Sequence, residues 1–264
     1  MRHPPVPIAV MGGSGLYSFM GDAEMVAVDT PYGAPSAPVA VGEVAGRPVA
    51  FLPRHGLQHE YPPHRINYRA NLWALHSLGV QQILAPCAVG ALAPKLGPGD
   101  LVVPDQLVDR TTGRVQTFVE EGAAHAPFAE PYCDRLRKVL LTSGPAIHDG
   151  GTMVVIEGPR FSTRAESQSY AGAGWSLVNM TGHPEAVLAR ELGICYATIA
   201  LVTDRDAGVA GDRPVDQSTV FAVFNKHLET VREVLHGTIA TLDESADCDC
   251  ASWSEGLSLP FLAS

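Results

Sequence analysis

Residues 196–202 read YATIALV, an apolar run in which polar and apolar side chains do not alternate. A strand without alternation is buried on both of its faces, as in sheets that are covered by helices on each side. The run leads directly into TDRD at residues 203–206, which places two carboxylates at the end of the strand. Similar apolar runs, bounded by glycine and proline, predict further strands at residues 8–11, 38–41, 49–52, 83–85, 101–103 and 153–156.

Helical patterns lie between some of these runs. Residues 71–78 carry leucines at helical spacing before Gly79, and residues 184–193 begin with a proline, which suits a first turn. The longest pattern starts near Asp216 and places apolar residues three and four positions apart. Strands that alternate with helices predict an α/β fold, a single domain with a central mixed β-sheet flanked by helices. We expect this domain to span residues 1–264, with an irregular C-terminal tail from about residue 244.

The composition is typical of a globular protein with a large core. Of the 264 residues, 46% are hydrophobic and 17% are charged, which excludes a disordered chain. The formal net charge of −10 argues against nucleic acid as a partner, although a few converging basic groups can still bind a small anion. The chain starts without an apolar signal segment, and no run is long enough to span a bilayer. We therefore expect a cytoplasmic protein with no membrane partner.

Two segments suit the binding of an anion. GGSG at residues 12–15 follows the first strand and can form a nest of backbone amides, although a plain strand-to-helix turn fits equally well. The third glycine of a dinucleotide-binding fingerprint is missing. Arg54 and His55 follow another strand, where a guanidinium beside an imidazole suits phosphate. The spacing of His55 and His59 would also allow a metal, but the zinc signature HExxH is absent and Gly56 favours a loop.

Three further segments place polar and aromatic groups at strand ends. EGPRFSTRAES at residues 157–167 surrounds Phe161, whose ring can stack on a planar ligand, but a solvated loop with salt bridges fits the segment equally. Thr181, beside Met180, offers a hydroxyl and amides to an anion, or simply caps the helix that follows. The two aspartates of the TDRD segment can titrate apart, one of them keeping a proton as an acid, or serve only as turn residues.

These segments occur in a definite order along nearly the whole chain. In that order the sequence resembles the trimeric purine nucleoside phosphorylases, and specifically their 5′-methylthioadenosine phosphorylase branch. The ordered set is specific, although no single segment is decisive. It comprises GGSGLY at 12–17, RHG at 54–56, NYRAN at 67–71, DQLVDRTT at 105–112, AEPYC at 129–133, EGPRFSTRAES at 157–167, NMT at 179–181 and TDRD at 203–206.

The resemblance implies a nucleoside phosphorylase-like fold and a phosphorolysis reaction. Inorganic phosphate would attack C1′ of the nucleoside and release adenine and 5-methylthioribose 1-phosphate. The resemblance also implies no metal, no organic cofactor beyond phosphate as a co-substrate, and a homotrimer or hexamer. The phosphate site that it implies consists of Ser14, Arg54, His55, Cys87, Ala88 and Thr181. The nucleoside site that it implies consists of Phe161, Ser162, Asn179, Met180, Asp204, Asp206, Val220 and, from a neighbouring subunit, His125.

Within this implied site the two aspartates contact the purine. The resemblance implies that Asp204 would be the catalytic acid, which would donate a proton to N7 of the departing base, and that Asp206 would accept from the 6-amino group. Cys87 stands where animal members have threonine, so backbone amides of Cys87 and Ala88 would replace a hydroxyl. Val220 lies by position at the apolar end that receives the 5′ substituent. The alternatives left open are a 5′ halogen or hydrogen and another purine nucleoside, such as methylthioinosine, inosine or adenosine.

The five cysteines fall into two groups. Cys87, Cys133 and Cys195 lie in apolar or mixed segments and are expected to be buried, reduced thiols. Some heat-stable relatives carry a terminal CxC disulfide, but a loop that small adds little stability. For Cys248 and Cys250, which lie in the acidic tail, we therefore favour a reduced, exposed pair, with metal scavenging or a redox contact as the alternative.

Overall fold

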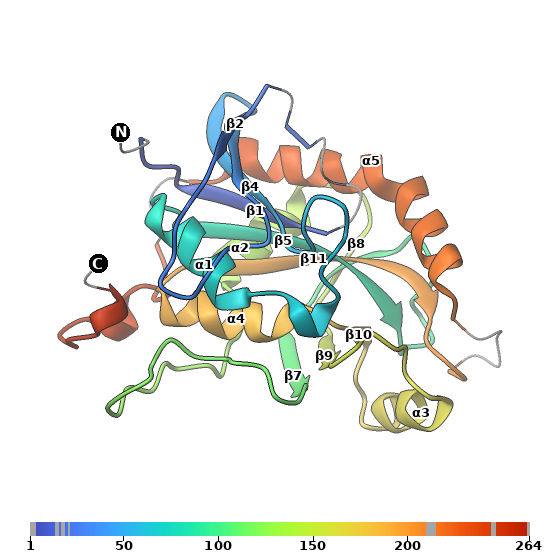
Figure 1. Ribbon diagram of the computed structural model, residues 1–264. Coiled ribbons are helices and arrows are strands. Elements are labelled where there is room, and N and C mark those ends of the chain that lie inside the picture. Colours follow the sequence, from blue (N-terminus) through green and yellow to red (C-terminus); the bar gives the residue numbers. More distant parts are fainter. Residues whose placement is uncertain are drawn as a thin grey trace.

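A mixed β-sheet forms the centre of the molecule (Figure 1). The computed structural model describes residues 4–13, 16, 19–20, 22–209, 215–243 and 247–262. The strand order is β2-β3-β4-β1-β5-β10-β9-β7, and β11 joins by pairing with β5 and β6, while β6 pairs with β8. The predicted α/β fold with a central mixed sheet is confirmed. The strands are β1 (Ile8–Gly12), β2 (Glu24–Val26), β3 (Val39–Val44), β4 (Arg47–Pro53), β5 (Gln82–Ala91), β6 (Leu101–Val103), β7 (Gln106–Arg110), β8 (Ile147–Asp149), β9 (Thr152–Ile156), β10 (Leu177–Asn179) and β11 (Cys195–Arg205).

Strands β5 and β11 are the longest strands and lie in the middle of the sheet. They pair in parallel from Cys195 opposite Gln82 to Arg205 opposite Ala91. β5 also pairs in parallel with β1 and antiparallel with β10. All of β11 up to Thr203 is buried, and its successive side chains enter two different core clusters. The lack of polar alternation at residues 196–202 follows, because both faces of the strand are covered.

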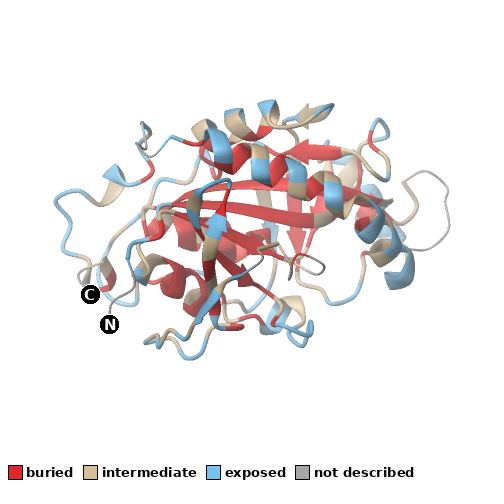
Figure 2. Cartoon of the chain, turned by 90° about the horizontal axis from the view of Figure 1, so that it is seen from above, coloured by how far each residue is buried: buried red, intermediate tan, exposed pale blue. Residues whose placement is uncertain are grey.

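Helices cover both faces of this sheet. In Figure 1, α5 lies above the sheet and α1 and α4 lie below it. Residues of α1 and α4 share one core cluster, whereas α2 and α5 contribute to the second. Along α5 buried and exposed residues alternate with the turns of the helix (Figure 2). The helices are α1 (Tyr68–Ser77), α2 (Asp134–Thr142), α3 (Arg164–Gly172), α4 (Gly182–Glu191) and α5 (Gln217–Thr241), with short 3₁₀ turns η1 (Pro63–Arg65), η2 (Ser252–Ser254) and η3 (Pro260–Leu262).

The sequence did not predict the helices α2 and α3 as such. In α2 only Leu136 and Leu140 are buried, and charged residues fill much of the remaining surface, so the apolar pattern is short. The segment that contains α3 looked like a polar loop. Thr163 and Glu166 form a reciprocal capping box there, and Glu166 also pairs with Arg160 on the surface. Glu166 therefore takes part in both the salt bridge and the helix start.

The C-terminal segment packs on the body of the protein. Phe261 is buried in the cluster shared by α1 and α4. Cys250 is buried in the cluster on the other side and Cys248 is half-buried beside it, so the predicted exposure of this pair is wrong. The pair is buried because its backbone passes over the start of β11, where the Cα of Ala251 would lie 3.2 Å from a Cβ placed on Gly193. Cys87, Cys133 and Cys195 are free and buried, as predicted.

No helix among the described ranges is long and apolar enough to cross a membrane.

Candidate active site

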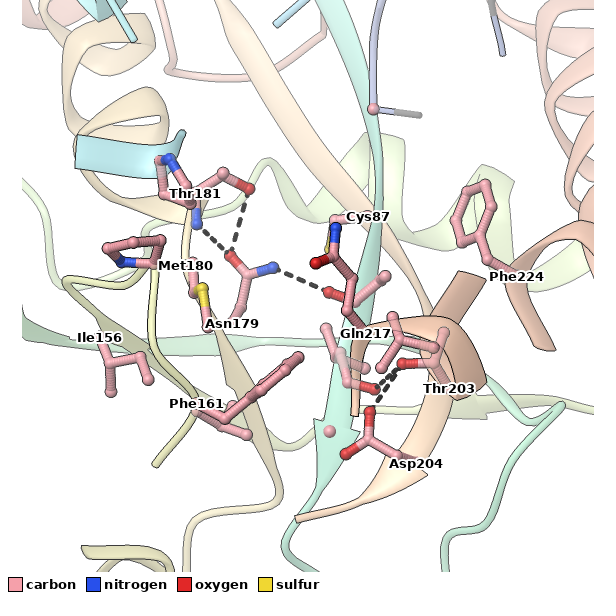
Figure 3. Close-up of a pocket in the computed structure, with 18 of the residues that line it drawn as sticks. Cys87, Ile156, Phe161, Asn179, Met180, Thr181, Thr203, Asp204, Gln217 and Phe224 are labelled. Carbon is pink, nitrogen blue, oxygen red and sulfur yellow. Dashed lines mark hydrogen bonds between the residues drawn. The ribbon is translucent and has the colours of Figure 1, made fainter. Parts of the chain in front are cut away.

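A cavity of about 370 Å³ opens where several strands end. β1, β4, β9, β10 and β11 all point their carboxyl ends or last residues into it, the usual position of ligand sites in α/β sheets. The N-terminal half of α5 closes one side (Figure 3). The lining residues are Gly13, Arg54, His55, His59, Pro62, Pro63, Cys87, Ala88, Val89, Gly90, Ile156, Pro159, Phe161, Ser162, Val178, Asn179, Met180, Thr181, Thr203, Asp204, Asp206, Gln217, Val220, Phe221 and Phe224.

Most of the residues singled out in the sequence line this one cavity. They are Arg54, His55, Cys87, Ala88, Phe161, Ser162, Asn179, Met180, Thr181, Asp204, Asp206 and Val220. Ser14 lies outside the described residues, and its neighbour Gly13 lines the cavity. His125 does not line the cavity of its own chain; its side chain is exposed in the segment between β7 and α2.

Arg54 is buried and held by four hydrogen bonds. Its Nε and Nη2 donate to the Glu185 carboxylate at 2.6 and 3.0 Å, and the carbonyls of Met11 and Pro86 accept from Nη2 and Nη1. Burial by itself lowers the pKa of Arg54, but the adjacent Glu185 more than offsets this and the pKa is raised. A guanidinium has five N–H donors, so one N–H of Nη1 remains for a ligand. The hydroxyl of Tyr196 also donates to Glu185 at 2.9 Å.

Sequence reasoning missed Glu185 as a site residue, although it lies two positions after His183 in the segment that follows Thr181. Its side chain is completely buried. A glutamate in the first turn of α4 is compatible with simple helix capping, so only the fold shows that it pairs with Arg54.

His55 is a neutral imidazole in this site. Its Nδ1 lies 2.8 Å from the carbonyl of Tyr61, which can only accept, so Nδ1 carries the proton. Burial lowers the pKa of His55 to about 3, and the Tyr61 carbonyl offsets only part of that effect. Nε2 therefore has a free lone pair. The ring stacks on His59 at 4.3 Å rather than converging with it on one point, which disfavours the metal alternative for this pair.

Asn179 fixes the backbone on one side of the cavity (Figure 3). Its Oδ1 accepts from the amides of Thr181 and Gly182, each at 2.7 Å, and its Nδ2 donates to the carbonyl of Ala88 at 3.1 Å. The amide of Thr181 is therefore not available to an anion, contrary to the expectation from sequence. The Thr181 hydroxyl makes no capping bond to the helix and has only a long contact of 3.4 Å to Asn179.

Cys87 lies in β5 next to the buried guanidinium. Burial raises the pKa of its thiol to about 12, although Arg54 acts in the opposite direction, so the thiol stays protonated. A neutral S–H is a weak donor and does not replace the hydroxyl of a threonine in full.

Asp204 lies at the opposite side of the cavity from Asn179 (Figure 3), and Asp206 also lines the cavity. The pairing of β11 with β5 shifts register between Val202 and Asp204, where the strand leaves the regular ladder. Burial raises the pKa of Asp204 to about 6; the hydroxyl of Thr203, which donates to Oδ2 at 2.8 Å, opposes this, and the charge of Asp206 adds to it. Asp206 is buried and accepts from the hydroxyl of Ser167 at 2.6 Å. A carboxyl that keeps its proton near neutral pH is suited to act as an acid.

Gly90 leaves the space that this carboxylate pair needs. A Cβ at residue 90 would lie 3.0 Å from Oδ1 of Asp204 and 2.9 Å from Val178. Any larger residue in this position of β5 would therefore push on the aspartate side of the cavity.

The wall between these two sides is apolar, with one unpaired polar atom. Phe161 and Met180 line it, and Gly158 has a positive φ of 66° at a point where a Cβ would lie 2.7 Å from the Met180 sulfur. Ser162 is buried, and its Oγ has no hydrogen-bond partner within the described chain. A buried hydroxyl without a partner in a cavity wall is a group that a ligand can satisfy.

The far end of the cavity is formed by α5. Val220, Phe221 and Phe224 present apolar surface, and His59 packs edge-on against Phe221 with the ring centres 5.9 Å apart. Gln217, at the first position of the helix, is the one polar lining residue that α5 contributes among the described residues. The sequence predicted only Val220 here, because the other positions are ordinary members of an amphipathic helix pattern.

The chain is similar to known proteins in sequence and in fold. Residues 7–240 match the model of the phosphorylase superfamily. The chain is 55% identical to an S-methyl-5′-thioadenosine phosphorylase of Mycolicibacterium smegmatis, covering 96% of this chain and 98% of that one. It is 52% identical to a purine nucleoside phosphorylase of Streptomyces coelicolor, covering 92% and 91%. Among solved structures, the methylthioadenosine phosphorylase of Schistosoma mansoni in complex with adenine superposes with a TM-score of 0.88, at 37% identity and covering 95% and 96%.

Substitution of Glu185 tests how far Arg54 depends on its carboxylate partner. We expect Glu185→Gln to lower the free energy of unfolding by about 3–5 kcal/mol, because it leaves a buried guanidinium charge without compensation. Urea denaturation measures the change. The control is Glu229→Gln, which removes a carboxylate that lies on the surface 3.5 Å from Arg232 and should change stability by less than about 0.5 kcal/mol. Equal effects of the two substitutions would show that the buried pair is not needed.

Proposed function

The chain belongs to the phosphorylase superfamily, and we propose that it cleaves 5′-methylthioadenosine with inorganic phosphate to adenine and 5-methylthioribose 1-phosphate. The observation that carries the proposal is the pairing, in one cavity, of an anion-binding side around Arg54 with a carboxylate side around Asp204. Holding both reactants in one cavity removes much of the entropic cost of a bimolecular reaction. The proposed reaction uses no metal and no organic cofactor.

Phosphate binds, in this proposal, beside Arg54, His55 and Thr181. The remaining N–H of Arg54 and the hydroxyl of Thr181 donate to phosphate oxygens, and backbone amides near Gly13 and Cys87 complete the cradle. His55 plays a different role. Because its Nε2 carries no proton, it accepts from the hydroxyl of monohydrogen phosphate and leaves the other phosphate oxygens to face C1′. Arg54 is largely neutralised by Glu185, so the site selects phosphate by hydrogen bonds more than by net charge.

Cleavage of the glycosidic bond makes the sugar positive and the purine negative. The bound phosphate stabilises the positive charge that develops at C1′. Asp204, whose raised pKa keeps a share of it protonated near neutral pH, donates to N7 of the leaving base. Thr203 holds the carboxyl through its hydroxyl bond. Asp204 is thus the proposed catalytic residue, and exclusion of water by the bound base would favour its protonated form further.

The base and sugar contacts follow from the remaining walls. Asp206, oriented by Ser167, accepts from the 6-amino group, and the unpaired hydroxyl of Ser162 hydrogen-bonds to the base. Phe161 packs on the purine ring and Met180 on the ribose. Asn179 acts chiefly by holding the Thr181 backbone in place. The apolar surface of Val220, Phe221 and Phe224 receives the methylthio group, while Gln217 is the residue that would tolerate a more polar 5′ substituent.

We also propose a homotrimer in which His125 reaches the cavity of a neighbouring subunit. Its exposure away from its own cavity supports such a role. Light scattering should give the mass of three chains, or of six if trimers pair, whereas a fully active monomer would contradict the assignment. A cytoplasmic location and a domain that extends over residues 1–264 remain predictions from the sequence.

A comparison of substrates tests the proposed reaction. We expect phosphate-dependent release of base to be fastest with 5′-methylthioadenosine, slower with adenosine, and slowest with inosine and methylthioinosine, because Asp206 opposes a 6-oxo group. The four rates are measured by monitoring the release of base with chromatography. The purine nucleoside phosphorylase name of the Streptomyces coelicolor relative makes inosine the alternative substrate, and a higher rate with inosine would favour that function instead.

Asp204→Asn tests the proposed acid. Turnover of 5′-methylthioadenosine should fall by about two to four orders of magnitude, because asparagine has a similar shape but no acidic proton. In the unsubstituted enzyme kcat/KM should decline as the pH rises above about 6, since the free acid loses its proton there. This limb should disappear in the variant, while any limb due to phosphate itself remains. An unchanged rate and pH profile would mean that another group protonates the base.

His55→Ala tests the proposed contact to phosphate. The KM for phosphate should rise about ten-fold, the scale of one hydrogen bond to a charged group, while the KM for the nucleoside changes little. Steady-state kinetics with each substrate varied in turn give both constants. His236→Ala, which removes an exposed imidazole of α5, is the matched control. A parallel rise in both constants would indicate a general disturbance of the cavity.

A further inference from the structure

Four cysteines that the proposed reaction does not use come together at the other end of β11. Cys133 precedes α2, Cys195 is the first residue of β11, and Cys248 and Cys250 belong to the C-terminal segment. Their sulfur atoms all lie within 4.8 Å of one another. The sulfurs of Cys195 and Cys248 are 3.3 Å apart. Three segments that are distant in sequence therefore converge on one small sulfur-lined space.

These distances fit a tetrahedral metal ion. With a Zn–S bond of about 2.3 Å, the sulfurs of a Cys₄ zinc site lie about 3.8 Å apart. Three of the four cysteines are buried and the fourth is half-buried, so the cluster is largely shielded from water. A closed site with four protein ligands is the arrangement of structural rather than catalytic zinc.

The surrounding charge favours thiolates over neutral sulfur. Nη2 of Arg135 lies 3.8 Å from the Cys195 sulfur and donates to Oε1 of Gln82 at 2.7 Å. Its Nε and Nη1 are buried and have no hydrogen-bond partner among the described residues. No carboxylate among the residues that the structure describes forms an ion pair with Arg135. A zinc tetrathiolate, which carries a net charge of −2, would place negative charge beside this guanidinium, whereas four thiols or two disulfides would not.

We propose that Cys133, Cys195, Cys248 and Cys250 bind one structural Zn²⁺. The thiols lose their protons to solvent as the metal binds, so the ion replaces the S–H groups that now contact one another. The site ties the C-terminal segment to the start of β11 and to α2. It lies nine residues from Asp204 along an extended strand, about 30 Å at roughly 3.3 Å per residue, so the metal stabilises the fold and takes no part in the reaction.

Metal analysis of the full chain tests the proposal. When it is purified with a reductant and without a chelator, the protein should contain about one zinc per chain, as measured by inductively coupled plasma mass spectrometry. Cys250→Ser should lose most of this zinc, whereas Cys87→Ser, which changes the fifth cysteine, should retain it. Removal of zinc should lower the Tm by at least about 5 °C. A protein without metal whose five thiols all react with an alkylating agent would overturn the proposal.

Cobalt gives a readout that does not depend on whether a variant folds. Adding Co²⁺ to the unsubstituted, metal-free protein should produce the thiolate charge-transfer and visible bands of tetrahedral Co²⁺–sulfur coordination, and excess Zn²⁺ should abolish them. Absence of these bands would contradict the site. A mass lower by four hydrogens without reductant treatment, which indicates two disulfides in place of the thiolates, would contradict it as well.

Discussion

The parallel pairing of β5 and β11 is the constraint on which the rest of the structure depends. The two strands run side by side from Gln82 and Cys195 to Ala91 and Arg205, and helices cover both of their faces. Because parallel strands present their carboxyl ends at one edge, the ladder delivers Cys87, Gly90 and Asp204 to the same cavity. Its opposite end brings Cys195 to Cys133 and the C-terminal segment. The proposed active site and the cysteine cluster thus lie at opposite ends of this strand pair.

The electrostatics of the cavity are less cationic than the residue types suggest. Arg54 is matched by a fully buried Glu185, His55 is held neutral by burial and by the Tyr61 carbonyl, and Cys87 stays protonated. The chain has a formal net charge of −10, and the phosphate site that we propose therefore binds phosphate through oriented hydrogen-bond donors and one acceptor, Nε2 of His55. On the other side, burial and the neighbouring Asp206 give Asp204 the raised pKa that an acid needs. On both sides of the cavity, burial determines the protonation states of the titratable side chains more than added charges do.

The sequence alone predicted the central strands and most of the residues that line the cavity, but it did not reveal residues whose roles depend on contacts across the fold. Long apolar runs such as 196–202 revealed the central strands. Burial on both faces of a strand leaves an apolar run without polar alternation, which can be recognised without knowing the neighbouring strands. Every candidate residue among the described ones except His125 lines the cavity, and most of them follow the ends of strands that meet at one edge of the mixed sheet. Glu185, Gln217 and Phe221 were missed because their roles depend on contacts across the fold. Cys248 and Cys250 were expected on the surface because an acidic tail carries no signal of where it docks.

The most direct test follows the oxygen atoms of phosphate. The protein is incubated with 5′-methylthioadenosine and phosphate labelled with ¹⁸O in every position, and the sugar product is analysed by mass spectrometry. We expect adenine in equal amount to a 5-methylthioribose 1-phosphate that keeps all of the label, including the oxygen bonded to C1′. Release of adenine together with an unphosphorylated sugar, or no release when phosphate is present, would contradict it.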